Sequence, residues 1–434
     1  MISLINKLPI KLITLLFTRG TGLILTFSVS LFLARFFGSS ITGKYYLFLS
    51  ILTGISVITK FGFNSTLIKF CAHHSIEEEK EKIRGYWYTT SKVSIVLSLC
   101  IIILIISIAE IIRSTGYMLI DYEILTYLFI ALIPFTILGH NIAILVGLNH
   151  QATASITESI ALPGLFLFLV VIFYFYNSNS EQVIKYYTAA IITVFFISTS
   201  IIYKQLHSEN RSETINKKLL ISTSRPILGI NITNFLTDWS ATYILGIFGT
   251  LSQVGIYNIS WRLVTIMGIL LIIFNSINAP QYSKDFKKND INNINITARK
   301  TSSILFWLSL PIIISIIIFS EKILSFFGND FIQGAPILQI LAIGQIINFS
   351  SGSVGYLLLM TGHEKKLRNL TLGICIFQIS TLLIFVPQYN IYAAAIISTI
   401  TIALKNMISV YLAYKYIGVL SLPLIKLKIK QNEQ

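Results

Sequence analysis

The stretch VSIVLSLCIIILIISIA, residues 93–109, decides the fold class of this chain. It contains no charged residue and approaches the roughly 20 apolar residues with which a helix crosses a bilayer core of about 30 Å. The rest of the chain is similar: hydrophobic residues make up 54% of the 434, charged residues only 12%, and the mean hydropathy is +0.76. Soluble domains carry about 25% charged residues. The sequence therefore predicts an all-α polytopic membrane protein, because apolar runs this long are not barrel strands.

Apolar runs alternate with polar breaks along the whole chain, and this alternation predicts about twelve transmembrane helices. Their expected ranges are 12–37, 43–63, 86–109, 122–146, 156–176, 183–203, 222–247, 255–278, 301–319, 336–360, 370–387 and 391–414.

Two breaks in this pattern are similar. FFGSSITGKYY (36–46) returns as IFGTLSQVGIYN (247–258), which places Gly43 and Gly255 212 positions apart. This spacing predicts two pseudo-symmetric six-helix lobes that are parallel repeats, an arrangement found in transporters. The expected organisation is an N-terminal lobe (1–203), a linker (204–221), a C-terminal lobe (222–414) and a tail (415–434).

The basic residues are distributed unevenly between the two sets of loops. The set that includes both termini holds 22 of the 33 Lys and Arg, whereas the opposite set holds Lys44, Arg113, Lys185 and Lys322. Basic loops remain cytoplasmic, so both termini are predicted to be cytoplasmic. The net charge of +15 reflects this bias together with attraction to membrane lipids, and nucleic acid is not an expected partner.

Polar residues form stripes inside four of the predicted helices. A charge at mid-membrane costs about 2.5–3.5 kcal/mol, so such residues usually face a wet interior or a partner. The stripes are Arg19, Gly22, Thr26 and Ser30; Asn231, Asn234, Asp238 and Thr242; Asn258, Arg262 and Thr265; and Gln345, Asn348, Gly352 and Gly355.

Several cations at membrane depth favour an anionic ligand, and the arginine fork suits a pyrophosphate. The predicted pyrophosphate-binding residues are Arg19, Arg262, Arg225 and Lys405. The predicted sugar-facing cavity residues are Thr26, Asn231, Asn234, Asp238, Gln345 and Asn348. Two alternatives stay open: Arg19 and Arg225 could extend to lipid headgroups, and Arg262 could pair with Asp238 in a structural bridge.

Three other side chains, Asp238, Glu158 and His140, are candidates for H+ or Na+ coupling, against the alternative that they are hydrogen-bonded interior groups. Cys71, Cys100 and Cys375 have no metal or redox spacing. Neither a metal site nor a cofactor is predicted.

Three stretches carry a family resemblance: LARFFGSSITGKYYLFLSILTGISVITKFGFNSTLIKF (33–70), FFGNDFIQGAPILQILAIGQII (326–347) and MTGHEKKLRN (360–369). They resemble polysaccharide-export flippases of the O-antigen (Wzx) type, within the multidrug/oligosaccharidyl-lipid/polysaccharide exporter superfamily. The resemblance implies a MATE-like, V-shaped fold with two lobes. It also implies cavity cations at Arg19 and Arg262.

The function that this resemblance implies is translocation of an undecaprenyl-pyrophosphate-linked oligosaccharide, an O-antigen or related repeat unit, across the bacterial inner membrane by alternating access. A polymerase and a chain-length regulator of the same pathway are implied partners. Fourteen-helix relatives flip peptidoglycan precursor, and the two additional helices are missing here.

Two alternatives come from other functional classes. A cation-coupled drug exporter of the same superfamily would favour acidic cavity residues. An integral membrane O-antigen polymerase or glycosyltransferase would place a large catalytic loop outside, whereas the longest expected outer link is 320–335. The sequence therefore predicts a transporter and not an enzyme.

Overall fold

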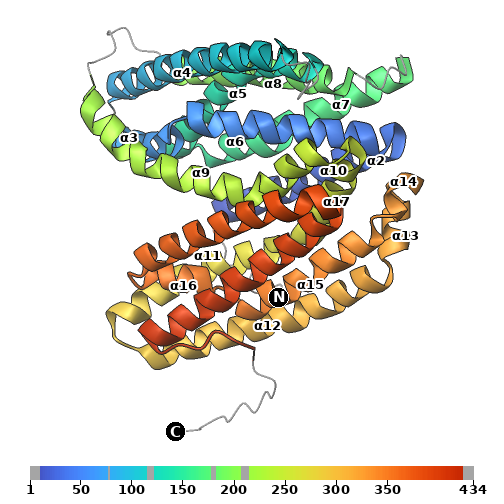
Figure 1. Cartoon of the computed structure of the whole chain (residues 1–434). Coiled ribbons are helices and arrows are strands. Elements are labelled where there is room, and N and C mark those ends of the chain that lie inside the picture. Colours follow the sequence, from blue (N-terminus) through green and yellow to red (C-terminus); the bar gives the residue numbers. More distant parts are fainter. Residues whose placement is uncertain (1–9, 77–78, 115–121, 177–181, 207–214, 424–434) are drawn as a thin grey trace. The chain divides into compact units, whose positions relative to one another are not determined.

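The computed structural model describes residues 10–76, 79–114, 122–176, 182–206 and 215–423, which are almost entirely helical (Figure 1). Each of the twelve predicted ranges falls on helical structure. The helices of the first half are α2 (Ile10–Thr59), α3 (Phe63–Ile76), α4 (Lys80–Ser114), α5 (Tyr122–Gly147), α6 (Gln151–Ser155), η1 (Ile156–Ala161), α7 (Leu162–Tyr176) and α8 (Val183–Gln205). Those of the second half are α9 (Lys217–Phe248), α10 (Leu251–Thr265), α11 (Gly268–Lys287), α12 (Ile291–Ile318), α13 (Ser320–Ser325), α14 (Asn329–Ile332), α15 (Ala335–Ser351), α16 (Val354–Met360) and α17 (Glu364–Ile417).

Within the described residues, seven helices are long and apolar enough to cross a membrane, or nine if each bent pair, α10 with α11 and α15 with α16, forms one span. The all-α polytopic membrane fold class is therefore confirmed. Helices α2 and α17 each contain two of the predicted spans. The number of spans, twelve, stays a prediction.

The breaks inside α2 and α17 are shorter than the sequence indicates. The predicted link between the first two spans is a single non-helical residue, Gly38 (φ 78°, ψ −179°). Only glycine adopts this backbone conformation without strain. In α17 the helix breaks at Asn390 (φ 48°), three residues after Pro387. Asparagine is one of the residues that tolerate positive φ.

Several predicted loops are also helical. The expected loop 64–85 contains α3 and the start of α4, and the expected outer link 320–335 contains α13 and α14. Hydropathy marks where a span leaves the apolar layer and not where its helix ends. Glu, Lys and Arg are good helix formers, so helices continue through charged sequence.

The chain divides into two compact units. The first unit combines Met1–Phe37 with Lys44–Phe235, and the second combines Gly38–Gly43 with Leu236–Gln434. The division therefore lies inside α9 and, around Gly38–Gly43, inside α2. The predicted lobes and their linker stay a prediction, and residues 207–214 of that linker and 424–434 of the predicted tail lie outside the described residues.

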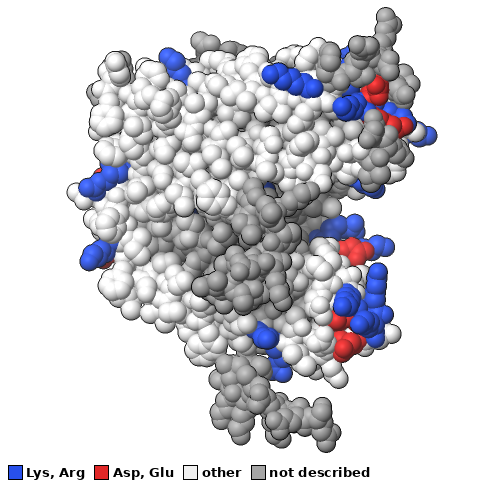
Figure 2. Space-filling model, turned by 180° about the vertical axis from the view of Figure 1, so that it is seen from behind, with Lys and Arg blue, Asp and Glu red and all other residues white. Residues whose placement is uncertain are grey.

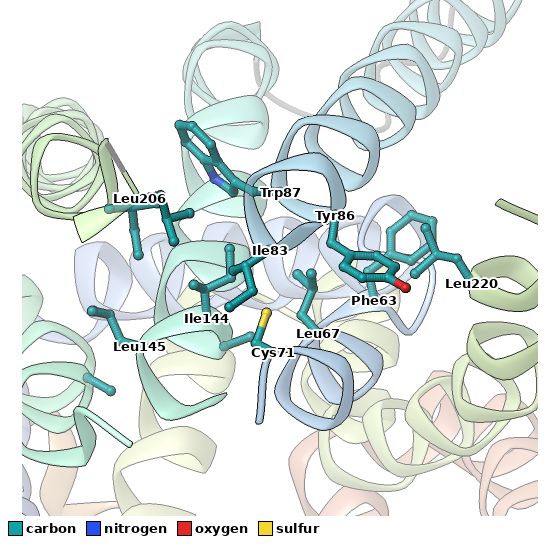
Figure 3. Close-up of a cluster of buried hydrophobic side chains, with 13 residues drawn as sticks. Phe63, Leu67, Cys71, Ile83, Tyr86, Trp87, Ile144, Leu145, Leu206 and Leu220 are labelled. Carbon is teal, nitrogen blue, oxygen red and sulfur yellow. The ribbon is translucent and has the colours of Figure 1, made fainter. Parts of the chain in front are cut away.

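Helix α5 forms the centre of the first unit, where it packs against α3, α4 and α8. One end of this packing is a hydrophobic cluster in which side chains from α3, α4, α5, α8 and α9 meet (Figure 3). Phe63, Leu67, Cys71 and Ile144 are fully buried there. By contrast, most of the apolar span of α4 is exposed, as expected for a helix that faces lipid.

Buried polar side chains of α5 form hydrogen bonds with uncharged side chains of neighbouring helices. His140 lies between Ser94 Oγ and Asn64 Oδ1, each 2.9 Å from a ring nitrogen. Asn141 accepts a hydrogen bond from Trp87 Nε1 (2.9 Å) and donates to Ser198 and Thr199 of α8 (both 2.9 Å). This network fixes α5 against its neighbours.

Replacing Asn141 by leucine is expected to destabilise the first unit, because the Trp87 N–H would be left buried without an acceptor. Such a loss costs about 1–3 kcal/mol. A lower thermal unfolding midpoint of the detergent-solubilised protein would confirm it. The matched control is Ser200→Ala on the exposed face of α8, where the hydroxyl bonds only to its own helix.

Helix α15 has the corresponding place in the second unit, where it packs against α10, α12 and α17. Here Asn406 of α17 donates to Asn348 Oδ1 of α15 (3.2 Å). In both units an amide on the fourth predicted helix therefore bonds to the sixth. A second hydrophobic cluster, which includes Tyr282, Leu357 and Ala413, joins α11, α16 and α17.

The surface of the protein is largely apolar. Figure 2 shows Lys, Arg, Asp and Glu grouped near the edges of the face that it draws, while residues without charge fill most of the remainder. Large hydrophobic side chains are exposed on most of the long helices. Such a surface is favourable in contact with lipid and unfavourable in contact with water.

Candidate functional site

The second unit contains a cavity of about 400 Å³ between its helices. Helices α9, α10, α11, α15, α16 and α17 all contribute to its walls. The lining residues are Thr237, Asp238, Trp261, Thr265, Gly268, Leu271, Asn275, Gln345, Asn348, Gly352, Ser353, Gly355, Tyr356, Gln378, Ser398, Thr401, Ile402, Lys405 and Asn406. Four of the residues predicted from the sequence to be functional, Asp238, Gln345, Asn348 and Lys405, are therefore brought together.

One wall of the cavity is a chain of amides. Asn348 Nδ2 donates to Gln345 Oε1 (2.9 Å), and Asn406 Nδ2 donates to Asn348 Oδ1 (3.2 Å). The chain continues to Ser351, whose hydroxyl donates to Asn406 Oδ1 (2.8 Å). These bonds fix the orientation of each amide and hold α15 against α17.

Three lining residues carry polar atoms without a hydrogen-bond partner among the described residues. They are Asn275 Oδ1 on α11 and both Gln378 Oε1 and Thr401 Oγ1 on α17. Gln378 is anchored from its other end, since its Nε2 donates to the carbonyl oxygen of Thr237 (3.1 Å). A buried amide oxygen without a donor is unfavourable, so these atoms indicate where a ligand or water would bind.

Two opposite charges line the same cavity. Asp238 on α9 is exposed to it, Lys405 on α17 is half-buried, and the lysine charge acts on the carboxylate. Charges attract more strongly in a partly buried site than in bulk water. The cavity therefore has no net formal charge.

Arg19 lies in the first unit, where Glu158 is its ion-pair partner. Arg19 Nη2 is 3.3 Å from Glu158 Oε2, and the two side chains are 57% and 49% exposed. Two predicted functional residues with different expected roles are thus neighbours. The charge of Glu158 also reaches Lys60, which lies over the ring of Phe135 (4.5 Å).

The geometry around this ion pair depends on small residues and on an irregular helix. Glu158 is part of the π-helical turn η1, which precedes Pro163. Gly22 lies against Ser159, and Thr18 Oγ1 is 2.8 Å from Ser155 Oγ. A side chain at position 22 would clash with Ser159, so glycine allows α2 and η1 to approach closely. π-Helical turns are frequent at functional sites.

The other predicted residues are not among those that line the cavity. Thr26 is half-buried and donates to the carbonyl of Gly22 within its own helix. His140 is buried in the α5 network described above. On α9, Arg225 and Asn234 are exposed and Asn231 is half-buried. Arg262 is half-buried on α10, next to the lining residue Trp261. Their roles, including coupling by His140, stay predictions.

The lining residues that were not predicted from the sequence include Trp261, Asn275, Tyr356, Gln378 and Thr401. Thr401 could have been found, because Ser398, Thr401 and Lys405 repeat at three and four residues and so share one helix face. Asn275 and Gln378 are single amides in apolar runs. No pattern distinguishes them there.

In the part of the chain that the structure describes, no group of three or more His, Cys, Asp or Glu side chains forms a metal site. The cavity offers one carboxylate and several amide and hydroxyl oxygens to a ligand. These atoms favour a hydrogen-bonding ligand, and coupling to H+ or Na+ at Asp238 stays a prediction.

Comparison with known proteins gives one family. The family described as "Polysaccharide biosynthesis protein" matches residues 11–284, which is more than half of the chain. A relative from Haloferax volcanii, described as the probable low-salt glycan biosynthesis flippase Agl15, is 23% identical over 393 residues, covering 89% of this chain and 79% of the relative.

Solved structures share the fold at low sequence identity. An inward-facing multidrug resistance MATE family transporter of the MOP superfamily aligns with a TM-score of 0.74 at 13% identity, over 91% of this chain and 94% of that one. The lipid II flippase MurJ, in an inward closed conformation, aligns with a TM-score of 0.71 at 16% identity, over 92% and 86%. The resemblance drawn from the sequence is confirmed for the family and the fold.

Proposed function

We propose that this chain, which belongs to the polysaccharide biosynthesis protein family, is a flippase that moves a lipid-linked glycan across a membrane. The family match carries the proposal, and the similarity to a probable glycan biosynthesis flippase agrees with it. The protein is a transporter and not an enzyme. The polar cavity in the second unit supports the proposal, because polar side chains inside a membrane protein are costly and often line the path of a substrate.

For the lipid carrier, the glycan, the membrane and the partners, we propose what the sequence predicts. We propose undecaprenyl-pyrophosphate as the lipid carrier, an O-antigen or related surface polysaccharide unit as the glycan, and the bacterial inner membrane as the location. A polymerase and a chain-length regulator are the proposed partners. Arg19 is the proposed contact for pyrophosphate, since its guanidinium is exposed and Glu158 orients it.

The runner-up is export of cationic drugs, which shares this fold. It requires a cavity with surplus negative charge. Asp238 supplies one negative charge, but Lys405 lines the same cavity and offsets it. The cavity therefore favours a neutral polar ligand over a cationic one.

Gene deletion tests the proposed function. The deletion strain should accumulate a lipid-linked oligosaccharide in the cytoplasmic leaflet and lose the corresponding surface glycan, and the intact gene should reverse both changes. Mass spectrometry of extracted lipids identifies the glycan. A deletion strain with normal surface glycans and no accumulated lipid-linked intermediate would rule the proposal out.

The proposed topology, with both termini cytoplasmic, has its own test. In a Cys100→Ala background, an impermeant maleimide added to intact cells should label Lys322→Cys and leave Lys288→Cys unlabelled; both positions are exposed. Native Cys71 should not interfere, because burial raises the pKa of its thiol to about 12 and keeps it protonated. Labelling of Lys288→Cys in intact cells would refute the topology.

A further inference from the structure

The lining of the cavity in the second unit includes hydrogen-bond acceptors that lack a donor among the described residues. Asn275 Oδ1 and Gln378 Oε1 are side-chain carbonyl oxygens, which can only accept, and neither has a donor among the described residues. Gln378 is almost fully buried, with 3% of its surface exposed. Its amide cannot rotate freely, because Nε2 is bonded to the carbonyl of Thr237. A ligand that satisfies these two oxygens must therefore supply O–H or N–H groups.

The charges of the cavity argue against a phosphate ligand. A pyrophosphate in this space would meet Lys405, but it would also meet Asp238 and the two amide oxygens, all of which repel negative charge. The remaining lining residues are uncharged. A neutral group with many hydroxyls avoids this conflict.

Two aromatic side chains complete the lining. Trp261 on α10 and Tyr356 on α16 offer flat surfaces, and Trp261 is held in place by stacking on Tyr257 (centroids 6.2 Å apart, 14° between planes). Aromatic faces next to hydrogen-bonding groups match the mixed apolar and polar character of a sugar ring. The volume of about 400 Å³ falls within the range of roughly 300–1,000 Å³ typical of small-molecule sites.

We propose that this cavity is a binding subsite for a neutral sugar of the transported glycan, with Asn275, Gln378 and Thr401 accepting from sugar hydroxyls. In this arrangement Lys405 neutralises Asp238 and does not bind pyrophosphate. The inference rests on the proposed flippase function, and it names the part of the substrate that the second unit recognises.

Binding is measured first, on the purified full-length protein in nanodiscs. The probes are the methyl glycosides of glucose, galactose, mannose and N-acetylglucosamine, with methyl glucuronide as the acidic comparison. At least one neutral glycoside should change tryptophan fluorescence with a Kd of about 1 mM, as expected for a ligand of this size. The acidic sugar should bind at least tenfold more weakly.

Variants locate the binding. Gln378→Leu and Asn275→Leu should each weaken binding by tenfold or more, and Trp261→Phe should remove the fluorescence change. The matched control is Met407→Leu, an exposed position on the same helix as Lys405, which should bind like the unmodified protein. Binding that is unchanged in Gln378→Leu and Asn275→Leu, or absent for every neutral glycoside, would overturn the subsite.

A double-mutant cycle of Lys405 and Asp238 tests the role of Lys405 in cells. Lys405→Met and Asp238→Asn should each lower glycan export at least tenfold, because each leaves one unbalanced charge in the cavity. The double variant should recover export to within about threefold of the unmodified protein. If Lys405 instead bound pyrophosphate, the double variant would be as inactive as Lys405→Met.

Glycan export in cells and glycoside binding by the purified protein distinguish failure of this inference from failure of the proposed function. A deletion strain with normal glycan export would reject the flippase function, whereas glycoside binding would still support a sugar site in the cavity. Conversely, an active flippase that binds no neutral glycoside and exports normally with Gln378→Leu would reject the subsite alone.

Discussion

Replacing Arg19 by alanine is expected to reduce surface glycan export by tenfold or more while the protein is still made and inserted. The loss follows from the proposed contact with pyrophosphate: a hydrogen bond to a charged group contributes about 1.5–3 kcal/mol, which corresponds to roughly 10- to 100-fold in transport. A gel ladder of the surface polysaccharide, from a deletion strain complemented at matched expression, measures the effect.

The structure indicates that this variant will fold. The ion pair with Glu158 is about half exposed on both sides, and such pairs contribute only about 0–1 kcal/mol to stability. Removing a cation from a membrane helix also makes insertion easier. A reduced ladder can therefore be attributed to transport.

Three further variants distinguish pyrophosphate binding by Arg19 from its ion pair with Glu158. Arg19→Lys keeps the charge but loses the two-pronged geometry, so partial activity is expected. Glu158→Gln should have a much smaller effect than Arg19→Ala. The exchange of both residues, Arg19→Glu with Glu158→Arg, restores an ion pair and should remain inactive.

Two results would count against this role of Arg19. A normal ladder with Arg19→Ala would mean that the side chain reaches only to lipid headgroups. Full recovery in the exchanged pair would mean that the ion pair itself, and not the arginine, is required.

The sequence predicts the helices well because the bilayer imposes one requirement on every span. Runs such as 93–109 satisfy it by composition alone, so the helices lie close to their predicted ranges. The ends of the helices are predicted poorly. Buried apolar side chains hold α3 as a helix through an expected loop, and one glycine, Gly38, replaces an expected link.

The candidate site is only partly predictable because its members meet in space and not in sequence. The pairing of Arg19 with Glu158 joins residues 139 positions apart, and hydropathy contains no information about it. The charges Asp238 and Lys405 are conspicuous in apolar helices. Gln378 is recognisable only from the structure, which shows that its oxygen lacks a donor among the described residues.

The repeated motif, by contrast, has a direct structural counterpart. Gly43 and Gly255, which belong to the two similar stretches, meet within the second unit. A Cβ atom on Gly43 would fall on the carbonyl group of Leu251, and one on Gly255 would lie 3.0 Å from Gly43 N and 3.2 Å from the carbonyl carbon of Ser39. The two segments therefore cross with their backbones in contact, and Ser39 Oγ lies 2.8 Å from Ser252 Oγ beside the crossing.

Gly43→Ala and Gly255→Ala are expected to be among the most destabilising single substitutions in the protein. The atoms that the new methyl group would meet belong to the backbone and cannot rotate away, so the two segments must separate. Overpacking of this kind costs about 1–3 kcal/mol or more. We expect a lower yield of monodisperse protein in detergent and a lower thermal midpoint for both variants.

Gly373→Ala is the matched control, because Gly373 lies inside α17 and no described atom lies within 4 Å of the place that the alanine methyl group would take. There the same substitution should be neutral or stabilising by up to about 1 kcal/mol, since alanine is the better helix former. Ser39→Ala removes the hydroxyl contact without changing the spacing and should have a small effect. If Gly43→Ala and Gly255→Ala matched Gly373→Ala in yield and midpoint, the repeated glycines would not be required for the crossing, and the repeat would need another explanation.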